Sequence, residues 1–174
     1  MPRPSVEIYY YRMRCRLGTL LLAAGDRGLR RLQLDGELPK PAANELWIES
    51  RNRLRDYEEQ LHEYLQGNLR EFTCALDPTG TEFQKRCWEA LRTIPYGQTR
   101  SYAEIAKQVG APRAFRAVGQ ANHANPIAII IPCHRVIGSG GGLTGYGGGL
   151  KMKEQLLRLE SSVLQGSFQF AAAI

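Results

Sequence analysis

The feature that most constrains the fold is a run of apolar residues at positions 127–131 that stops at Pro132. The run is too short for a membrane helix, and its length and composition predict a fully buried strand. Cys133, His134 and Arg135 follow, so such a strand would hold these side chains rigidly at its end. The sequence therefore predicts a buried strand that ends in a thiol and an imidazole.

Cys133 has two interpretations. A thiolate is a soft nucleophile, and a nearby imidazole favours its formation. Neighbouring residues of an extended chain point to opposite faces, so Cys133 and His134 would meet only if the backbone turned or a water bridged them. Cysteine after an apolar run is also often an inert core residue, because free cysteine packs as a small hydrophobe.

Positive charge is unevenly divided along the 174 residues, a length that suits one large domain or two small ones. Residues 1–80 carry 12 Lys and Arg against 12 Asp and Glu, whereas residues 81–160 carry 11 against 5. The formal net charge of +6 therefore lies in the second half. A basic half suggests a polyanionic partner, most simply nucleic acid, although a basic surface kept for solubility would look the same.

The four cysteines, Cys15, Cys74, Cys87 and Cys133, are scattered, so neither a disulfide framework nor a CxxC zinc site is indicated. His62 could join Cys15 or Cys74 at a metal, but it is more simply a surface or packing residue. No apolar run reaches the length of a membrane span, and the Arg-containing start lacks the apolar core of a signal peptide. We therefore expect a reducing, intracellular location and no metal.

The first half predicts a small sheet covered by a helix. Three short segments with interleaved apolar and polar residues read as an antiparallel sheet of about three strands: residues 5–16, 19–24 and 29–34. From residue 44 to residue 66 apolar positions recur at helical spacing, and Gly67 provides the stop. This helix would cover the sheet.

The second half predicts helices. Thr81 with Gln84 and Ser101 with Glu104 form two capping boxes, which mark helix starts. The second of these helices would run through residue 108, and a glycine-containing turn at 110–112 separates it from the next. Two short helices joined by a tight turn are the helix-turn-helix signature, although a plain αα-hairpin fits the same pattern. The later helix, over residues 113–122, would present arginines and small residues to a nucleic-acid backbone: Arg113, Arg116, Ala114, Ala117 and Gly119.

Three features complete the second half. Asn125-Pro126 forces an extended geometry and ends the preceding helix. Residues 138–149 hold eight glycines, which would let the backbone approach a flat ligand closely. Residues 151–160 predict a closing amphipathic helix.

The fold class that follows is an α/β N-terminal domain with a short antiparallel sheet, plus a mostly α-helical C-terminal domain containing a helix-turn-helix. We place the first domain at residues 1–76 and a linker at 77–80. The second domain covers residues 81–160, and an uncharged apolar tail covers 161–174.

The helix-turn-helix pattern, Asn125-Pro126, Pro-Cys-His-Arg-Val at 132–136 and the glycine-rich loop occur in an order that resembles the O6-alkylguanine-DNA alkyltransferases. The resemblance covers residues 80–160, about half of the chain. It implies direct-reversal DNA repair: an alkyl group would pass from O6-alkylguanine, and from O4-alkylthymine, in duplex DNA to Cys133. The base would be flipped out of the helix, because O6 cannot be reached inside the stack.

The resemblance also implies residue roles. Cys133 would be the nucleophile and final acceptor, with His134 as a base acting through water and oriented by Glu160. Tyr102 would hydrogen-bond a guanine ring nitrogen, and Asn125 would be a hinge. Arg116 would fill the gap left by the flipped nucleotide, and the remaining DNA contacts would come from the helix described above. The alkylguanine pocket would be lined by Val136, Tyr146, Gly147, Gly148 and Asn122.

One turnover per molecule is implied, with no cofactor, because a thioether is stable. Duplex DNA would be the partner, with no membrane and no obligate protein partner. The location would be cytoplasmic, at the nucleoid in a prokaryote, or nuclear in a eukaryote. Two departures from some relatives, Gly147 for a serine and Asn122 for a bulkier apolar residue, could leave a roomier pocket.

Three alternatives stay open. A catalytically silent relative would bind alkylguanine without reacting, although such relatives lack the acceptor cysteine. A helix-turn-helix transcription factor would use Cys133 only for packing and would bind one sequence tightly. A cysteine hydrolase would turn over an ester or amide with Cys133 and His134.

Overall fold

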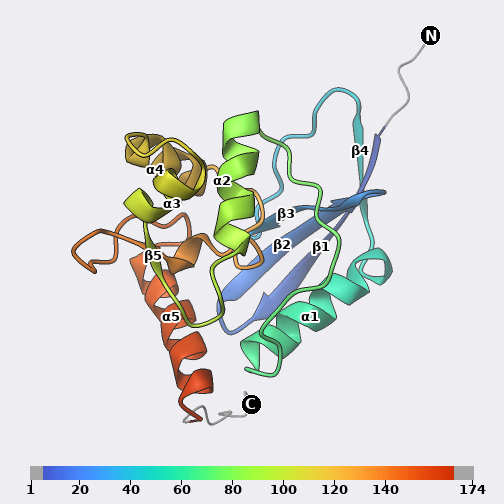
Figure 1. Ribbon diagram of the computed structural model, residues 1–174. Helices are drawn as coiled ribbons and strands as arrows, with labels where there is room; N and C mark the ends of the chain where they lie inside the picture. The colour runs from blue at the N-terminus through green and yellow to red at the C-terminus, as the bar shows by residue number, and fades with distance from the viewer. Residues whose placement is uncertain (1–5, 167–174) are drawn as a thin grey trace.

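The computed structural model describes residues 6–166, and its first half is built around one four-stranded sheet (Figure 1). The strands are β1 (Val6–Cys15), β2 (Gly18–Gly25), β3 (Gly28–Gln33) and β4 (Glu45–Glu49), in the order β3-β2-β1-β4. Strands β1, β2 and β3 are antiparallel neighbours, as predicted. The sheet is nevertheless mixed, because β4 pairs in parallel with β1.

The predicted helix over residues 44–66 is wrong in its first part. Strand β4 occupies its start, a 3-10 turn η1 (Asn52–Leu54) follows, and helix α1 (Arg55–Leu65) begins only then. The apolar residues at helical spacing begin at Leu54, so the pattern does not predict a helix for the residues before it. Helix α1 lies against the sheet and buries Leu61 and Tyr64 (Figure 1).

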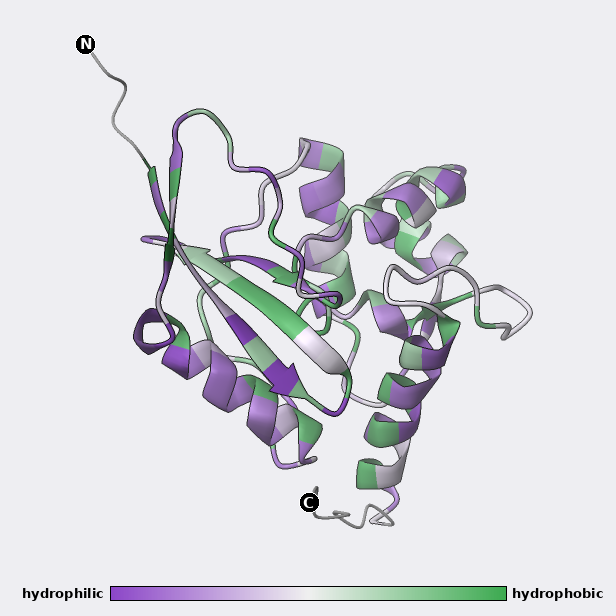
Figure 2. Ribbon diagram, turned by 180° about the vertical axis from the view of Figure 1, so that it is seen from behind, coloured by the Kyte–Doolittle hydropathy of each residue, from purple (hydrophilic) through white to green (hydrophobic). Residues whose placement is uncertain are grey.

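The centre of the sheet supplies the core. Residues 20–24 of β2 are at most 5% exposed, and Figure 2 shows this stretch as a continuous hydrophobic band. Ile8 and Met13 of β1 are also buried. Apolar residues from both halves join these strands in one cluster, so the two halves share a core.

Four helices form most of the second half: α2 (Glu82–Arg92), α3 (Tyr102–Gln108), α4 (Phe115–His123) and α5 (Leu150–Leu164). Both predicted capping boxes are confirmed, at the starts of α2 and α3. Short strands β5 (Arg100–Ser101) and β6 (Val136–Ile137) pair in parallel. Helices α3 and α4 pack on each other and on α2 (Figure 1).

Two helix boundaries differ from the predictions. Helix α4 begins at Phe115, so Arg113 and Ala114 belong to the turn before it, which follows Pro112. Helix α5 continues past Glu160 to Leu164, so the first residues of the predicted tail are helical. Residues 167–174 of that tail lie outside the described residues. Among residues 6–166, no helix is both long and apolar enough to cross a membrane.

The apolar run at 127–131 is buried, but the prediction of a strand is wrong. Its chain turns: the N–H of Ile131 donates to the carbonyl oxygen of Ile127 at 3.0 Å. Ile129 has a φ of 71°, the one positive φ among the described non-glycine residues. Consecutive apolar residues indicate burial but do not distinguish a strand from a buried turn. The following residues form a short 3-10 helix, η2 (Cys133–Arg135).

The edge of the sheet holds the second half in place. The N–H of Leu32 in β3 donates to the carbonyl oxygen of Pro126 at 2.9 Å, and the N–H of Ala128 donates back to Leu32 at 3.1 Å. Leu29 makes a similar pair of hydrogen bonds with Ala75 and Asp77. Strand β3 therefore fixes the chain just before η2.

Candidate active site

The side chain of Asn125 ties together the turn that precedes Cys133. Its Oδ1 accepts from the N–H of Ile127 at 3.0 Å, and its Nδ2 donates to the carbonyl oxygen of Ile131 at 2.8 Å. The same Nδ2 lies 3.1 Å from Sγ of Cys133. An asparagine amide can donate and accept at once, which a carboxylate or an aliphatic side chain cannot do. Asn125 thus both closes the turn at residues 127–131 and contacts the sulfur of Cys133.

Cys133 is 7% exposed and sits on η2, a geometry in which the backbone turns. Burial raises the pKa of the Cys133 thiol, while the Asn125 hydrogen bond and the positive charge of Lys153 act in the opposite direction. The sulfur is therefore a thiol at neutral pH and needs a base before it can react as a nucleophile.

His134 lies next to it, completely buried, with Nε2 2.7 Å from Oε1 of Glu160. Burial lowers the pKa of His134, although the Glu160 hydrogen bond and charge raise it. Burial also raises the pKa of Glu160, but the hydrogen bonds and charges of His134 and Arg135 outweigh this effect and lower it to about 2. The pair is therefore a carboxylate and a neutral imidazole.

This charge state fixes the tautomer of His134. A carboxylate accepts only, so Nε2 must carry the proton, which leaves a lone pair on Nδ1. Nδ1 has no hydrogen-bond partner among the described protein groups. It is therefore the nitrogen of His134 that is free to accept a proton.

The carboxylate of Glu160 is held by several more donors. The guanidinium of Arg135 reaches both oxygens, with Nη2–Oε1 2.9 Å and Nε–Oε2 3.0 Å, and its Nη1 donates to the carbonyl oxygen of Ile94 at 2.7 Å. The N–H of Gly97 donates to Oε2 at 2.9 Å, and the hydroxyl of Tyr64 donates to Oε1 at 2.7 Å. Glu160 and Arg135 are both buried, and an unpaired buried charge would destabilise the fold. Each therefore neutralises the charge of the other.

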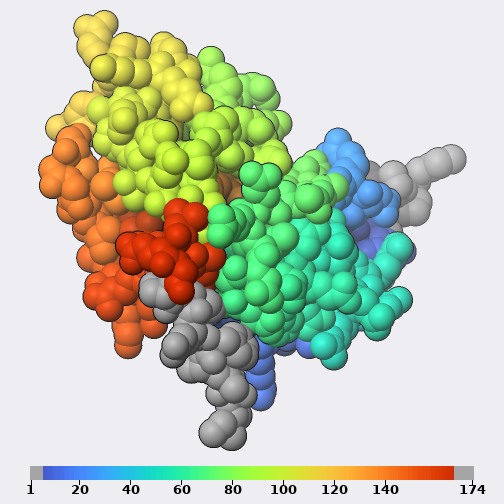
Figure 3. Space-filling view, turned by 60° about the horizontal axis from the view of Figure 1, so that its bottom comes forward, coloured from blue at the N-terminus to red at the C-terminus, as the bar shows by residue number. Residues whose placement is uncertain are grey.

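Gly97 shows why the chain approaches so closely here. Its φ of 74° favours glycine, and a Cβ would lie 2.1 Å from Cδ1 of Leu164. Figure 3 shows the end of α5, in red, on the surface against this part of the chain. Glu160 itself lies one turn earlier and is completely buried.

Two adjoining hollows of about 410 Å³ and 240 Å³ meet over Cys133. Both are lined by Asn122, His123, Cys133, Tyr146 and Gly147. The larger is also lined by four residues of the first half, Leu32, Gln33, Leu34 and Asp35. Asn125, Ala128 and Gly148 of the second half complete it. Val136 is completely buried and does not line either hollow.

Several polar groups of this cleft have no partner among the described protein groups. They are the side-chain oxygen and nitrogen of Asn122, the hydroxyl of Tyr146 and Oε1 of Gln33. Burial raises the pKa of Tyr146 well above its usual range, so its hydroxyl stays protonated. Buried polar groups ordinarily find hydrogen-bond partners, so these atoms suit a polar ligand edge.

Tyr102 faces the smaller hollow from the start of α3. Its hydroxyl donates to the carbonyl oxygen of Thr144 at 3.3 Å. The buried Lys153 donates to the same carbonyl oxygen at 2.8 Å and also to that of Val136. Lys153 thereby holds the glycine-rich loop and β6 together.

The predicted helix-turn-helix residues form a separate surface beside the cleft. Arg113 and Arg116 are exposed, on the turn and on α4 respectively. Gly119 lies beside Tyr102: a Cβ added at Gly119 would be 3.8 Å from the Tyr102 ring. Phe115 is 48% exposed, and the Arg116 guanidinium lies 6.0 Å from its ring centroid.

The remaining residues of this surface, Ala114 and Ala117, are partly buried. Ala114 is the residue just before α4, and Ala117 lies in its first turn. The structure therefore places the predicted DNA-binding residues together at one end of α4, next to Tyr102.

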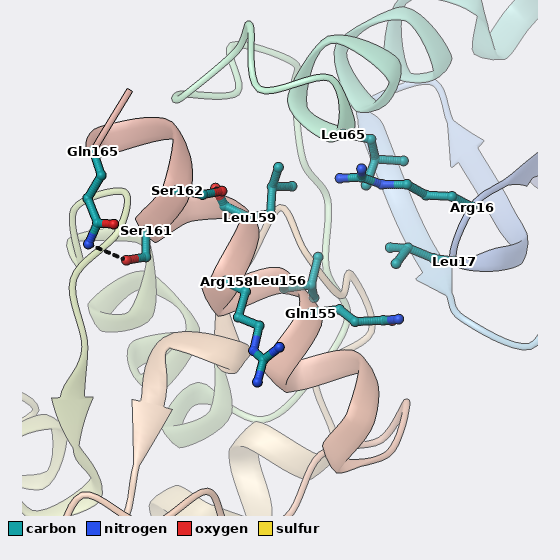
Figure 4. A pocket seen from close by; sticks show the side chains of 10 residues that line it. All are labelled: Arg16, Leu17, Leu65, Gln155, Leu156, Arg158, Leu159, Ser161, Ser162 and Gln165. Carbon is teal, nitrogen blue, oxygen red and sulfur yellow. Dashed lines mark hydrogen bonds between the residues drawn. The ribbon is translucent and has the colours of Figure 1, made fainter. Parts of the chain in front are cut away.

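A larger hollow of about 640 Å³ lies elsewhere, between α5, the end of α1 and the turn after β1 (Figure 4). Leucines, serines, glutamines and two arginines line it, with no cysteine, histidine or carboxylate. Its size alone does not make it a reactive site. Within residues 6–166, no group of three or more His, Cys, Asp or Glu side chains is arranged to hold a metal ion.

Sequence reasoning missed three members of the site. Tyr64 falls within the predicted helix over residues 44–66, which assigns it no role, and Arg135 is predicted only as part of a motif. Lys153 had no assigned role. A buried lysine or tyrosine has no local sequence signal, because its partners lie far away along the chain; Tyr64 and Glu160 are 96 positions apart.

Comparisons with known proteins match both halves of the chain. Residues 8–78 match the family model "6-O-methylguanine DNA methyltransferase, ribonuclease-like domain", and residues 82–162 match "6-O-methylguanine DNA methyltransferase, DNA binding domain". A methylated-DNA–protein-cysteine methyltransferase of Methanosarcina acetivorans is 49% identical over 89% of this chain and 99% of its own. One of Mycolicibacterium paratuberculosis is 54% identical over 83% of this chain and 87% of its own.

Solved structures give the same result. The chain is similar to Mycobacterium tuberculosis OGT in complex with DNA, with a TM-score of 0.81 and 48% identity over 91% of this chain and 94% of that one. The family resemblance noted in the sequence is thus confirmed. With both halves matched, the chain belongs to the 6-O-methylguanine DNA methyltransferase family, whose enzymes are methylated-DNA–protein-cysteine methyltransferases.

Proposed function

We propose that this protein repairs DNA by direct reversal, moving an alkyl group irreversibly from O6-alkylguanine in duplex DNA to its own Cys133. The observation that carries the proposal is a buried sulfur that opens onto a cleft and is contacted by Asn125, with the next residue, His134, hydrogen-bonded to Glu160. Family membership and the names of the relatives support the same reaction.

The chemistry balances with groups of this chain. Cys133 gives its proton to Nδ1 of His134 through a bridging water, which is a good proton path when two groups do not touch. The thiolate attacks the alkyl carbon in line, so that a carbon–sulfur bond forms as the carbon–oxygen bond breaks. The electron pair of the broken bond stays on guanine, which takes up at a ring nitrogen the proton that His134 received, relayed through solvent.

Tyr102 and Asn122 would act on the base. The hydroxyl of Tyr102 would donate to a guanine ring nitrogen and so offset the charge that develops as guanine departs. The unpaired amide of Asn122 and hydroxyl of Tyr146 would hydrogen-bond polar atoms of the base. O4-alkylthymine presents an alkylated oxygen of the same kind, and we include it as a second substrate.

The base would leave the duplex to reach Cys133. Arg116 would enter the gap, with Arg113 on phosphates and the small residues Ala114, Ala117 and Gly119 permitting close approach. The net charge of residues 81–160 favours DNA as the partner. The protein would therefore act where chromosomal DNA is, at the nucleoid or in the nucleus.

Each molecule would react once, because no described side chain in the cleft offers a second nucleophile to release the thioether. The test uses duplex containing one O6-methylguanine, in molar excess over protein. We expect the amount of restored guanine to plateau at one per protein molecule, and none with Cys133→Ser. Continued turnover would indicate a hydrolase. Binding without restored guanine would indicate a silent relative, and tight binding of one unmodified sequence would indicate a transcription factor.

A further inference from the structure

Tyr64 is the one side chain of the sheet-containing half that reaches the hydrogen-bonding network of His134 in the described structure. It comes from α1 and is completely buried. Its hydroxyl donates to Oε1 of Glu160 at 2.7 Å and lies 3.5 Å from Nε2 of His134. The contact joins two segments 96 positions apart.

Oε1 of Glu160 is crowded with donors. Nε2 of His134, the hydroxyl of Tyr64 and Nη2 of Arg135 lie 2.7, 2.7 and 2.9 Å from it. Nε of Arg135 lies 3.2 Å from it as well. A carboxylate oxygen has two lone-pair directions, so these four donor atoms, from three side chains, must share its negative charge. Every donor added to Oε1 therefore weakens the attraction that this oxygen exerts on the His134 proton.

We propose that Tyr64 is a positioning residue of the alkyl transfer, which sets the basicity of His134 by sharing Oε1 of Glu160. The inference rests on the proposed function, and it gives the N-terminal half a part in the chemistry. Tyr64 touches neither the sulfur nor the cleft: it acts through Glu160.

The surroundings of Tyr64 suit a permanent donor. Its ring packs 5.3 Å from that of Phe72 and 6.0 Å, edge-on, from that of Tyr96. Burial and the neighbouring Glu160 charge raise the pKa of Tyr64 well above its usual range. The hydroxyl therefore keeps its proton at neutral pH.

The charged and titratable groups around His134 are few. Cys133 and Arg135 flank it on η2, Tyr64 comes from α1, Tyr96 from the segment after α2, and Lys153 and Glu160 from α5. Arg135 and Lys153 lower the pKa of His134, and Glu160 raises it. Removing the Tyr64 hydroxyl leaves all these charges in place and frees Oε1 for His134.

The sign of the effect follows. Without the Tyr64 hydrogen bond, the carboxylate attracts the imidazolium more strongly, so the pKa of His134 rises. Protonated His134 cannot accept the thiol proton. The acid limb of the rate–pH profile should therefore move to higher pH in Tyr64→Phe, by roughly half a unit to one unit.

The experiment measures single-turnover alkyl transfer from an O6-methylguanine duplex against pH for the wild type, Tyr64→Phe and Tyr57→Phe. Tyr57 is the other tyrosine of α1 and makes no contact with the network, so its profile should stay unchanged. A purely structural role for Tyr64 would lower the rate equally at every pH and leave the midpoint in place. That outcome would overturn the proposal.

A second readout separates this inference from the proposed function. The chain has three histidines, so the imidazole resonances of His62, His123 and His134 can be titrated by NMR in unreacted protein. We expect only the His134 midpoint to rise in Tyr64→Phe. An unchanged His134 midpoint would contradict the inference, whether or not alkyl transfer is observed.

If Tyr64→Phe does not fold, 3,5-difluorotyrosine can be placed at position 64 instead. Its hydroxyl is a stronger donor of the same shape. The midpoint of His134 should then move to lower pH, and no movement would again contradict the proposal.

Discussion

The two halves of the molecule differ in what they contribute to the site. The half after residue 80 carries the whole net charge and supplies Cys133, His134 and Glu160. The half before it has no net charge and supplies no reacting group. Nevertheless, β3 fixes the Asn125 turn through Leu32, and α1 reaches Glu160 through Tyr64.

The motif at 132–136 therefore marks the place of the proposed reaction, but it does not contain all the residues that position Cys133 and His134. The proposed reacting residues Cys133 and His134 are adjacent in the sequence, whereas part of their support comes from β3 and α1. Substitutions in the two halves should therefore differ in kind: loss of Cys133, His134 or Glu160 should abolish the proposed reaction, whereas loss of the Tyr64 hydroxyl should shift its pH dependence.

The largest effect is expected for Glu160→Gln, which leaves the buried Arg135 without a negative partner. Breaking a buried ion pair in this way should lower the free energy of unfolding by about 3–5 kcal/mol and remove alkyl transfer. Urea unfolding followed by circular dichroism measures the first quantity.

The matched control is Glu58→Gln in the first half. Glu58 also forms a two-point contact with an arginine, Arg51, but that arginine is 67% exposed. Its loss should cost less than about 1 kcal/mol. Equal losses for the two variants would show that burial does not distinguish the pairs.

Acid should destabilise the protein mainly through the second half. The pKa of Glu160 is about 2 in the folded protein against 4.5 ordinarily, so its contribution is complete above pH 4.5 and is lost as the pH falls toward 2. The shift corresponds to about 3 kcal/mol. The pKa of His134 is lowered from its ordinary 6.5, so protonation of the unfolded chain removes further stability as the pH falls below about 6.5.

The free energy of unfolding, measured from pH 7 to pH 2, tests whether stability falls with pH in this way. Glu160→Gln should flatten the curve between pH 4.5 and pH 2. Glu45→Gln in the first half removes a carboxylate whose pKa is lowered chiefly by a hydrogen bond from Trp47, and it should leave the curve nearly unchanged. A curve that is equally steep in Glu160→Gln would refute the assignment.

Charge gives the next comparison. Arg116→Ala should weaken binding and transfer on duplex by about ten- to hundred-fold, because its side chain is exposed at the start of α4. Arg14→Ala removes an equally exposed charge from β1 and should change neither. Fluorescence anisotropy at matched salt measures the affinity of the two variants for duplex DNA. Similar losses of affinity would mean that DNA does not bind preferentially to the second half.

The smallest effect concerns the glycine loop. A Cβ at Gly147 would meet open space, so Gly147→Ser should fold normally and lower the ratio of benzyl to methyl transfer rates by a few-fold. A Cβ at Gly148 would lie 2.4 Å from Cδ1 of Leu34, so Gly148→Ala should instead disturb the contact between halves and lower stability. An unchanged rate ratio in Gly147→Ser would end the idea of a roomier pocket.

The sequence was informative where interactions are local. Both capping boxes join residues three positions apart, and the antiparallel strands β1 to β3 follow one another along the chain. The acceptor candidate was found from a contiguous motif at Cys133. Each of these patterns is readable because its partners are close in sequence.

The misses share the opposite property. Strand β4 pairs with β1 through residues 39 positions apart, Val6 and Glu45, and Tyr64 hydrogen-bonds Glu160, 96 positions away along the chain. The run at 127–131 was read as a strand because burial alone produces the same apolar pattern. What makes it turn is the Asn125 side chain, which bonds both ends of the run.

The most direct test of the central claim is the intact mass of the protein after incubation with an O6-methylguanine duplex, followed by peptide mapping. We predict the addition of one methyl group, located on Cys133 and absent from Cys133→Ser. A methyl group on Cys15, Cys74 or Cys87, or no added mass while the methylated base disappears, would contradict the account.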